Sequence, residues 1–309
     1  MEYRRVGRTG LKVSALSLGG ELTQELRRGE RGALRLIEAA IERGVNYLDL
    51  ADIYGGGEAE RACGALLKGV PRSKLILSSK CYWSMSDGVN DRGLSRKHIV
   101  DSVERSLRRL QVDYLDLFYC HRFDHETPLE ETTRAMEDLI RQGKVLYWGT
   151  SGWSASQLYE ACAITSRSGG YAPVVEQSMY NLFERGIEYE LIPTARSLGV
   201  GLITWSPLAG GVLSGALRRS AERDQLTEGQ RRWVKPWLDD SSSAIVDRLI
   251  KLAPDLSCTP SQFALAWTLR RQEVASVLMG VRSEAQLDEN IKALGLSYDQ
   301  EVWDQLDQL

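Results

Sequence analysis

Four polar side chains stand where three consecutive apolar runs of the chain end. Asp49 and Tyr54 belong to YLDLADIYGGG, Lys80 to LILSSKCYW and His121 to YLDLFYCHRFD. Singly, each has an ordinary explanation: an aspartate that caps a helix, a lysine that reaches solvent, a histidine satisfied in the core. However, an ammonium at the end of an apolar strand is costly unless it is paired, and Asp49 is its natural partner. Together, the four side chains favour a reactive site.

The chemistry that this group suits is the protonation of a carbonyl oxygen. A free tyrosine has a pKa of about 10, and a neighbouring ammonium stabilises the phenolate form. Tyr54 could then release its proton near neutral pH while an imidazole contacts the same oxygen. A phenol, a lysine and a histidine around one point would serve a reaction in which hydride arrives at the carbonyl carbon.

These residues need strands whose carboxyl ends meet at one place. Short apolar runs alternate with segments of helical periodicity such as SRKHIVDSVERSLRRL, in which the apolar residues fall on one face. Regular alternation predicts a parallel sheet, and eight repeats predict a closed (β/α)8 TIM barrel with its site at the carboxyl ends of the strands. The predicted strands are 13–18, 45–50, 75–80, 115–119, 145–150, 174–177, 201–205 and 276–279.

We expect a single barrel domain over residues 1–309. Its longest connection would be residues 214–240, a polar and basic segment that follows the seventh strand. An ordered flap and a disordered surface insertion explain this segment equally well. Neither a G-x-G-x-x-G turn nor a Walker loop occurs in the sequence, so a doubly wound nucleotide-binding fold is not favoured.

Composition narrows the classes of protein. The chain has 39 Lys and Arg against 42 Asp and Glu and no long block of like charge, which argues against nucleic-acid and membrane partners. The five cysteines are scattered, and none forms C-x-x-C, as expected of reduced thiols. No apolar signal core or membrane-spanning run is visible. We expect a cytoplasmic protein that acts on a small molecule, with a homo-oligomer left open.

The sequence resembles the aldo-keto reductase superfamily over essentially its whole length. The resemblance rests on GRTGLKVSALSLG, the D-x-A-x-x-Y-G of residues 49–55, GKVLYWGTSGWS, EQSMYNLFER, TWSPLAGGVLSG and GVRSEAQLDEN. Within the superfamily, the chain is most similar to the branch that contains the voltage-gated potassium channel beta subunits.

The resemblance implies an NADPH-dependent carbonyl reductase with a catalytic tetrad of Asp49, Tyr54, Lys80 and His121. Tyr54 would be the general acid, assisted by Lys80, and Asp49 would hold Lys80. His121 would orient the carbonyl. The similar channel subunits have another residue at the histidine position, so His121 favours catalysis over a purely regulatory role.

The resemblance also implies a nicotinamide cofactor extended across the barrel mouth. Ser151 and Gln177 would bind its carboxamide, and Trp205 would stack on the nicotinamide ring. The pyrophosphate would be lined by Ser206, Leu208, Ala209 and Gly210. The adenosine end would be held by Gly280, Arg282, Gln286, Glu289 and Asn290. Among these, Arg282 is the candidate for the 2′-phosphate, since a guanidinium binds phosphate in a bidentate fork.

Three departures from the family pattern concern the cofactor contacts and the position after the catalytic Asp. Gly152 stands where relatives often have Asn or Arg beside the carboxamide, and Leu50 replaces the usual Thr. Ala216 stands where the channel subunits have a Lys near the pyrophosphate. Arg218 or Arg219 could replace that charge.

The substrate pocket departs from the family pattern as well. Gly20-Glu21-Leu22 replaces the usual Gly-Thr-Trp, so that Glu21 stands where a pocket aromatic is expected. We expect Glu21 to favour polar or cationic carbonyls, with Tyr82 and Trp83 as apolar walls. An unchanged aldehyde preference in Glu21→Trp would refute this. The natural substrate stays open.

Two other functions compete with a reductase. A regulatory subunit would keep the barrel and a tightly bound NADPH but turn over slowly. A metal-dependent barrel hydrolase would use Cys120, His121, Asp124 and His125. The chain has only three histidines and lacks H-E-x-x-H and H-x-H, so we expect no metal.

Overall fold

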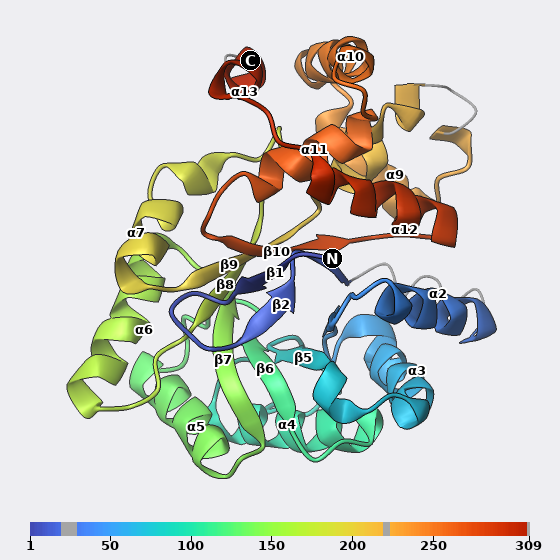
Figure 1. Ribbon diagram of the computed structural model, residues 1–309. Coiled ribbons are helices and arrows are strands. Elements are labelled where there is room, and N and C mark those ends of the chain that lie inside the picture. Colours follow the sequence, from blue (N-terminus) through green and yellow to red (C-terminus); the bar gives the residue numbers. More distant parts are fainter. Residues whose placement is uncertain (20–29, 219–222, 308–309) are drawn as a thin grey trace.

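Eight parallel strands close into a barrel in the order β10-β3-β4-β5-β6-β7-β8-β9 (Figure 1). The computed structural model describes residues 1–19, 30–218 and 223–307. The strands are β3 (Leu16–Leu18), β4 (Tyr47–Asp49), β5 (Ile76–Cys81), β6 (Leu115–Cys120), β7 (Val145–Ser151), β8 (Val175–Met179), β9 (Gly201–Trp205) and β10 (Val274–Met279). The predicted (β/α)8 TIM barrel is confirmed.

The first predicted strand, residues 13–18, is wrong in its extent. Lys12–Ser14 form β2, which pairs antiparallel with β1 (Tyr3–Arg5), and the barrel strand β3 begins only at Leu16. The hairpin closes one end of the barrel, because Val6 and Val13 are fully buried among residues of the barrel interior. Both strands are partly apolar, so the hydrophobic pattern does not show the break between them.

Helices surround the barrel and follow its strands (Figure 1). The long amphipathic segment predicted around residues 95–110 is α4 (Arg96–Leu110), and Ser95 caps it by accepting a hydrogen bond from the backbone N–H of His98. The other helices of the ring are α2 (Glu30–Glu42), α3 (Glu58–Leu66), α5 (Leu129–Arg141), α6 (Ala155–Ser168), α7 (Leu191–Leu198), α11 (Pro260–Leu269) and α12 (Glu284–Ile291). A further helix, α13 (Gln300–Asp307), follows α12.

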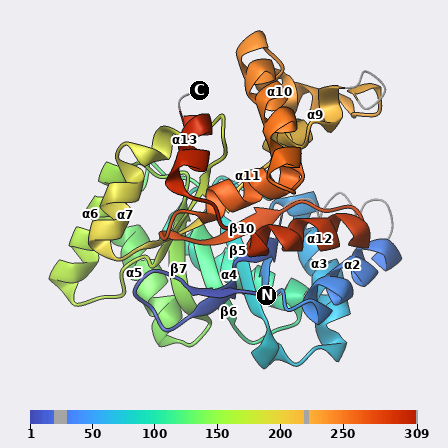
Figure 2. The ribbon, with the colours of Figure 1, turned by 45° about the horizontal axis from the view of Figure 1, so that its top comes forward.

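The predicted long connection after the seventh barrel strand is helical where the structure describes it. It contains α9 (Glu228–Val234) and leads into α10 (Asp240–Asp255). Figures 1 and 2 show α9 and α10 standing away from the barrel strands at one side of the molecule. Thr227 and Gln230 form a capping box that begins α9. Residues 219–222, and with them Arg219, lie outside the described ranges.

Two apolar layers hold the barrel together. One fills its interior and includes Tyr47, Leu117, Tyr119 and Ile203, while the other lies between the strands and the helices. All six positions of β6 are buried, as expected of a parallel strand covered on both faces. Side chains at the carboxyl ends of the strands therefore project into the mouth of a closed and rigid frame.

Candidate active site

A fully buried ion pair lies at the mouth of the barrel. Lys80 on β5 donates from Nζ to Oδ2 of Asp49 at the end of β4, over 2.5 Å, and to the carbonyl oxygen of Leu50 over 2.7 Å. The side chains of Lys80 and Asp49 are 0% and 1% exposed. Burial lowers the pKa of Lys80, but the charge of Asp49 and the hydrogen bonds to Asp49 and Tyr54 outweigh burial and raise it above its ordinary value. Lys80 is therefore a cation.

The second oxygen of Asp49 is held by three uncharged donors. Tyr47 donates its hydroxyl over 2.9 Å, Ser78 over 2.8 Å, and Gln177 donates from Nε2 over 2.9 Å, all to Oδ1. A buried carboxylate is tolerated only when its lone pairs are satisfied, and here they are. Asp49 is therefore fixed in one orientation, with Oδ2 directed at Lys80.

Tyr54 lies just beyond β4 in a short 3-10 turn, Tyr54–Gly57. Its hydroxyl is 3.4 Å from Lys80 Nζ, and the Nζ lies 5.0 Å from its ring centre. Gly55 and Gly56, which follow it, have φ of 63° and 66°, a conformation that costs glycine little. The glycines that follow the tyrosine in the sequence thus make the turn that brings the phenol back over Lys80.

His121 follows β6 and faces Tyr54. The two ring centres are 6.0 Å apart in an edge-to-face arrangement. Burial, together with the positive charges of Lys80 and Arg122, lowers the pKa of His121 to about 2. The imidazole is therefore neutral at physiological pH and retains a single N–H. Its Nδ1 is buried and has no hydrogen-bond partner in the described part of the chain.

Aromatic side chains line the space beside His121. The ring centre of Trp83 lies 6.5 Å from that of His121, and Tyr82 packs edge-on against Trp83 at 5.0 Å. Trp83 is 43% exposed, so its ring can contact a molecule in the mouth. Glu21, predicted to line the same pocket, lies outside the described residues.

The end of β7 lies against an arginine. Arg122 donates from Nη1 to the carbonyl oxygen of His121 over 2.5 Å and reaches the Oγ of Ser151 at 3.4 Å. A Cβ added to Gly152 would lie 3.5 Å from the same Nη1, and Gly152 has a φ of 67°. The guanidinium thus occupies the space beside Gly152 that a larger residue would take.

The end of β9 has an unusual backbone. Ser206 and Ala209 have φ of 54° and 47°, although they are not glycines, and Gly210 and Gly211 have φ of 64° and 95°. Such conformations cost a non-glycine residue about 1–3 kcal/mol and tend to gather at functional sites. Leu208, which lies between Ser206 and Ala209, is half-buried.

Trp205 lies at the end of the same strand, half-buried over the barrel interior. Trp233 of α9 packs on it with ring centres 6.1 Å apart and planes inclined by 30°. A Cβ on Gly210 would lie 2.7 Å from Val234 of α9. Helix α9 therefore lies directly on the segment predicted to bind the cofactor.

The residues predicted for the adenosine end gather on and before α12. Arg282 and Gln286 are exposed, and Gln286 accepts a hydrogen bond from the backbone N–H of Arg282 over 2.9 Å. Gly280 is also exposed, whereas Asn290 is buried. The Glu289 carboxylate accepts from the hydroxyl of Thr259 over 2.8 Å, so it also supports the start of α11.

Comparison with known proteins establishes the family. The profile of the Aldo/keto reductase family matches residues 15–309. The chain belongs to the aldo/keto reductase family. It is 41% identical over 300 residues to a protein of Oryza sativa subsp. japonica named probable voltage-gated potassium channel subunit beta, an alignment covering 95% of this chain and 91% of that protein. A protein of Arabidopsis thaliana with the same name is 39% identical over 304 residues, with 95% and 91% covered. Both parts of the resemblance, to the superfamily and to its channel-subunit branch, are confirmed.

The residues of this aldo/keto reductase fit the nicotinamide cofactor that the resemblance implies. The left-handed backbone at Ser206 and at Ala209–Gly211 is of the kind found in anion-binding loops. Within it, the N–H groups of Ala209 and Gly211 donate to the carbonyl oxygens of Ser206 and Leu208 over 3.0 and 2.9 Å, so a pyrophosphate would compete with these two bonds. The guanidinium of Arg282 is exposed and forms no ion pair within the described ranges, so it is available for a further phosphate.

Three residues near the tetrad of the aldo/keto reductase were not predicted as part of the site. Arg122 is one of them, and its position next to His121 in the sequence was the only signal. Glu176 accepts from Thr150, Ser178 and the backbone N–H of Gly152 over 2.5–2.9 Å, and burial raises its pKa to about 7. It thereby fixes the loop after Ser151.

Asp52 is the third residue, three positions after Asp49. It is 1% exposed, and neither carboxylate oxygen has a hydrogen-bond partner in the described chain. Burial, and next the charge of Glu60, raise the pKa of Asp52 to about 7. The sequence pattern D-x-A-D shows that position 52 is an acid. That Asp52 is buried becomes visible only in the folded structure.

No group of three or more His, Cys, Asp and Glu side chains in the described ranges of this aldo/keto reductase could hold a metal ion. No helix in the same ranges is long and apolar enough to cross a membrane.

Proposed function

We propose that the protein catalyses the NADPH-dependent reduction of aldehyde or ketone carbonyls to alcohols. The observation that carries the proposal is the position of the Lys80 ammonium, 2.5 Å from Asp49 Oδ2 and 3.4 Å from the Tyr54 hydroxyl. A buried cation fixed between a carboxylate and a phenol supports proton release from the phenol, because it stabilises the phenolate that remains.

Each member of the tetrad has one task in this proposal. Tyr54 donates its proton to the carbonyl oxygen, and Lys80 compensates the negative charge left on the phenol oxygen. Asp49 keeps Lys80 charged and in place. His121 is neutral and donates its N–H to the carbonyl oxygen, which orients the carbonyl toward Tyr54.

The remaining predicted residues would hold the cofactor. When bound, NADPH supplies the hydride that reaches the carbonyl carbon. Ser151 and Gln177 would contact its carboxamide and Trp205 its ring, while the backbone after Ser206 would face the pyrophosphate. Gln177 also donates to Asp49, so its second amide hydrogen or its carbonyl oxygen would face the cofactor.

Steady-state turnover tests the proposal directly. The wild type should oxidise NADPH in the presence of a panel of small aldehydes and ketones, with one alcohol formed for each NADPH consumed. Titration with NADPH and with NADH, followed by the fluorescence of the bound cofactor, would measure the preference for the 2′-phosphate. No turnover with any carbonyl, despite tight NADPH binding, would contradict a reductase.

A second candidate is a regulatory subunit that binds NADPH tightly and turns over slowly. The observation that favours it is the name of both relatives, probable voltage-gated potassium channel subunit beta. A single-turnover experiment separates the two candidates: in a reductase, the fluorescence of prebound NADPH falls within seconds after an aldehyde is added. In a regulatory subunit it would persist for many minutes.

The setting of this activity is also a proposal. All five cysteines are free and four of them are buried, which suits a reducing compartment such as the cytoplasm. The partner would be a small carbonyl compound. The single-domain organisation over residues 1–309 and the oligomeric state stay predictions, to be measured by limited proteolysis and sedimentation.

A further inference from the structure

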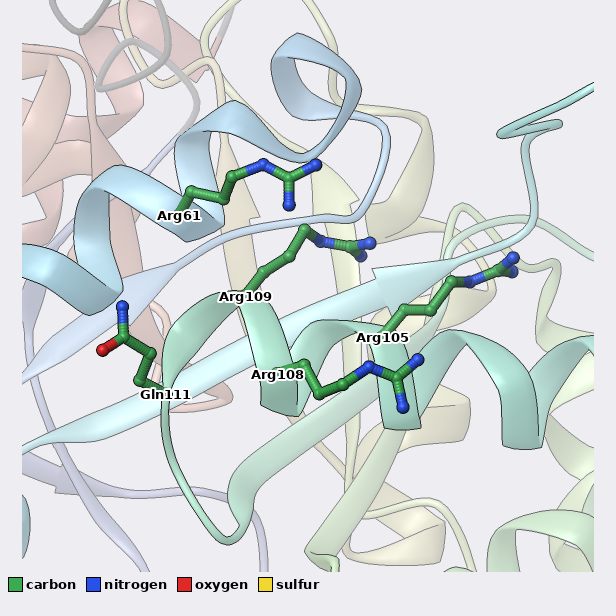
Figure 3. Close-up of a pocket in the computed structure, with 5 residues that line it drawn as sticks. All are labelled: Arg61, Arg105, Arg108, Arg109 and Gln111. Atoms are coloured by element: carbon green, nitrogen blue, oxygen red, sulfur yellow. The ribbon is translucent and has the colours of Figure 1, made fainter.

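A groove with a cationic lining lies on the outer wall of the barrel, between α3 and α4 (Figure 3). Its volume is about 470 Å³. It is lined by Arg61, Arg105, Arg108, Arg109 and Gln111. No carboxylate and no apolar side chain is among these lining residues, which we call the arginine groove. It involves neither β9 nor α12, where the predicted cofactor contacts lie.

The fold brings these arginines together in two ways. Arg105, Arg108 and Arg109 are spaced at i, i+3 and i+4 on α4, so they share one face of that helix. Helix α3 crosses α4 closely at Gly64, where an added Cβ would lie 2.5 Å from the carbonyl oxygen of Leu110. This crossing places Arg61 of α3 beside Arg109, and Figure 3 shows their guanidinium groups extending in the same direction.

Two of the guanidinium groups are fixed before any ligand arrives. Arg109 donates from Nε to the buried carboxylate of Glu60 over 2.6 Å and from Nη2 to Ser106 over 3.2 Å, and its side chain is only 9% exposed. Arg105 donates from Nη2 to Asp91 over 2.5 Å. Side chains held in this way lose little conformational freedom when they bind an anion.

The arginines are not fully compensated by acids. Glu58 pairs with Arg61, Glu60 with Arg109 and Asp91 with Arg105. No ion pair involves Arg108 within the described ranges, which leaves four guanidinium groups against three paired carboxylates. Asp52 also interacts electrostatically with Arg105 and Arg109, but it is partly protonated near neutral pH because burial raises its pKa to about 7. Each carboxylate takes only one or two of the five N–H groups of its arginine. The donors that remain for a ligand are chiefly those of the exposed Arg61 and Arg108, since the side chain of Arg109 is 9% exposed.

We propose that the arginine groove binds an anion that carries two or more phosphate groups. Guanidinium groups bind phosphate oxygens through paired N–H donors, and several of them along a groove match a chain of phosphates better than a single one. The lining offers no aromatic ring on which a base could stack, so the phosphates themselves are what the groove recognises. This site is separate from the proposed reductase activity.

Binding of tripolyphosphate, measured by titration calorimetry without divalent cations and at constant ionic strength, tests the proposal. The double variant Arg61→Ala/Arg108→Ala removes two exposed groups and leaves the buried Arg109–Glu60 pair intact. The matched control is Arg134→Ala/Arg167→Ala, which removes two exposed arginines from α5 and α6. All titrations are made on protein that has been loaded with NADPH and then freed of excess NADPH by gel filtration. The phosphate sites proposed at the barrel mouth are then filled, and no free dinucleotide competes for the groove.

The wild type and the control should bind tripolyphosphate with equal affinity, and the groove variant at least tenfold more weakly. Inorganic phosphate should bind the wild type at least tenfold more weakly than tripolyphosphate. The affinity for ATP should lie within threefold of the affinity for tripolyphosphate, because only the phosphates are recognised. This result is expected whether the physiological ligand is a nucleotide or a polyphosphate. Equal weakening in both double variants, equal affinity for inorganic phosphate, or binding of ATP without tripolyphosphate would each overturn the proposal.

Discussion

Replacing Asp49 with asparagine measures the electrostatic cost of the buried ammonium. The substitution keeps the size of the side chain and removes its charge, while Tyr47, Ser78 and Gln177 can still donate to the remaining oxygen. Lys80 then remains 0% exposed without a counter-charge. The free energy of unfolding should fall for that reason alone.

The size of the loss follows from the geometry. Removing one member of a buried, hydrogen-bonded ion pair costs about 3–5 kcal/mol, because the other charge stays uncompensated. The loss cannot exceed the free energy of deprotonating Lys80, because the folded variant can always release the proton instead of burying an unpaired charge. Deprotonation costs about 1.4 kcal/mol for each pH unit below the ordinary lysine pKa of about 10.4, which amounts to about 5 kcal/mol at pH 7. At pH 9 the same limit is about 2 kcal/mol.

The sign of the pH dependence is fixed by linkage. In Asp49→Asn the folded-state pKa of Lys80 lies below that of the unfolded chain, so between the two values the unfolded chain binds more protons and stability rises with pH. In the wild type the pKa of Lys80 is raised, so the ion pair contributes fully below the unfolded pKa. The difference between the two proteins should therefore shrink as the pH rises from 7 to 9.

Urea unfolding followed by circular dichroism at both pH values is the assay. Lys80→Met and the double variant complete a cycle, and the double variant should be more stable than the sum of the single losses predicts. A loss below about 1 kcal/mol at pH 7 would refute the reasoning, since such a value is typical of an exposed pair. A gap that does not narrow at pH 9 would refute it too.

Three further predictions concern the proton donor, the histidine and the helix crossing. Tyr54→Phe should lower kcat for aldehyde reduction by roughly 10²–10⁴-fold without weakening NADPH binding, as followed by steady-state kinetics and fluorescence titration; retained turnover would remove Tyr54 as the acid. The ratio of kcat/KM between the wild type and His121→Gln should stay constant from about pH 5 to 8, because an imidazole with a pKa of about 2 does not titrate in this range. A ratio that changes near the ordinary histidine pKa would contradict a neutral His121. Gly64→Ala should lower the free energy of unfolding, measured in urea, by about 1–3 kcal/mol, because the added Cβ would lie 2.5 Å from the Leu110 carbonyl oxygen. The control, Gly32→Ala on α2, has nothing within 4 Å of its added Cβ and should raise the free energy of unfolding by about 0.5–1 kcal/mol. Similar effects of the two substitutions would show that α3 and α4 do not cross closely at Gly64.

The barrel and the relative positions of the tetrad residues could be predicted because both follow from short-range patterns. A strand buried on both faces, such as β6, appears as an unbroken apolar run, and α4 has a regular apolar face. A closed parallel barrel then brings consecutive strand ends to one mouth. The predicted strand at residues 13–18 shows the limit of this method, since an apolar stretch can contain a turn.

The directions of individual side chains could not be predicted. Gln177 lies on β8 and was expected to face a cofactor, yet its amide donates to Asp49, 128 residues away in the chain. Trp233 belongs to a polar segment with no strand pattern, and only the placement of α9 brings it onto Trp205. Such contacts depend on how helices and strands pack, which composition and periodicity do not encode.

The bond from Gln177 to Asp49 has a thermodynamic consequence. One N–H cannot serve both the carboxylate and a ligand, so a molecule that attracts this amide removes one of the four donors of Asp49. Asp49 would then attract Lys80 more strongly, and less of the positive charge of Lys80 would be available to stabilise the phenolate form of Tyr54. Because coupling between two equilibria is reciprocal, the protonation of the site must change the affinity for that molecule by the same factor. Calorimetric titrations in buffers of different ionisation enthalpy would show whether the cofactor takes this N–H. A net exchange of protons would accompany loss of the bond to Asp49, and none is expected from this source if the cofactor contacts the other amide atoms of Gln177.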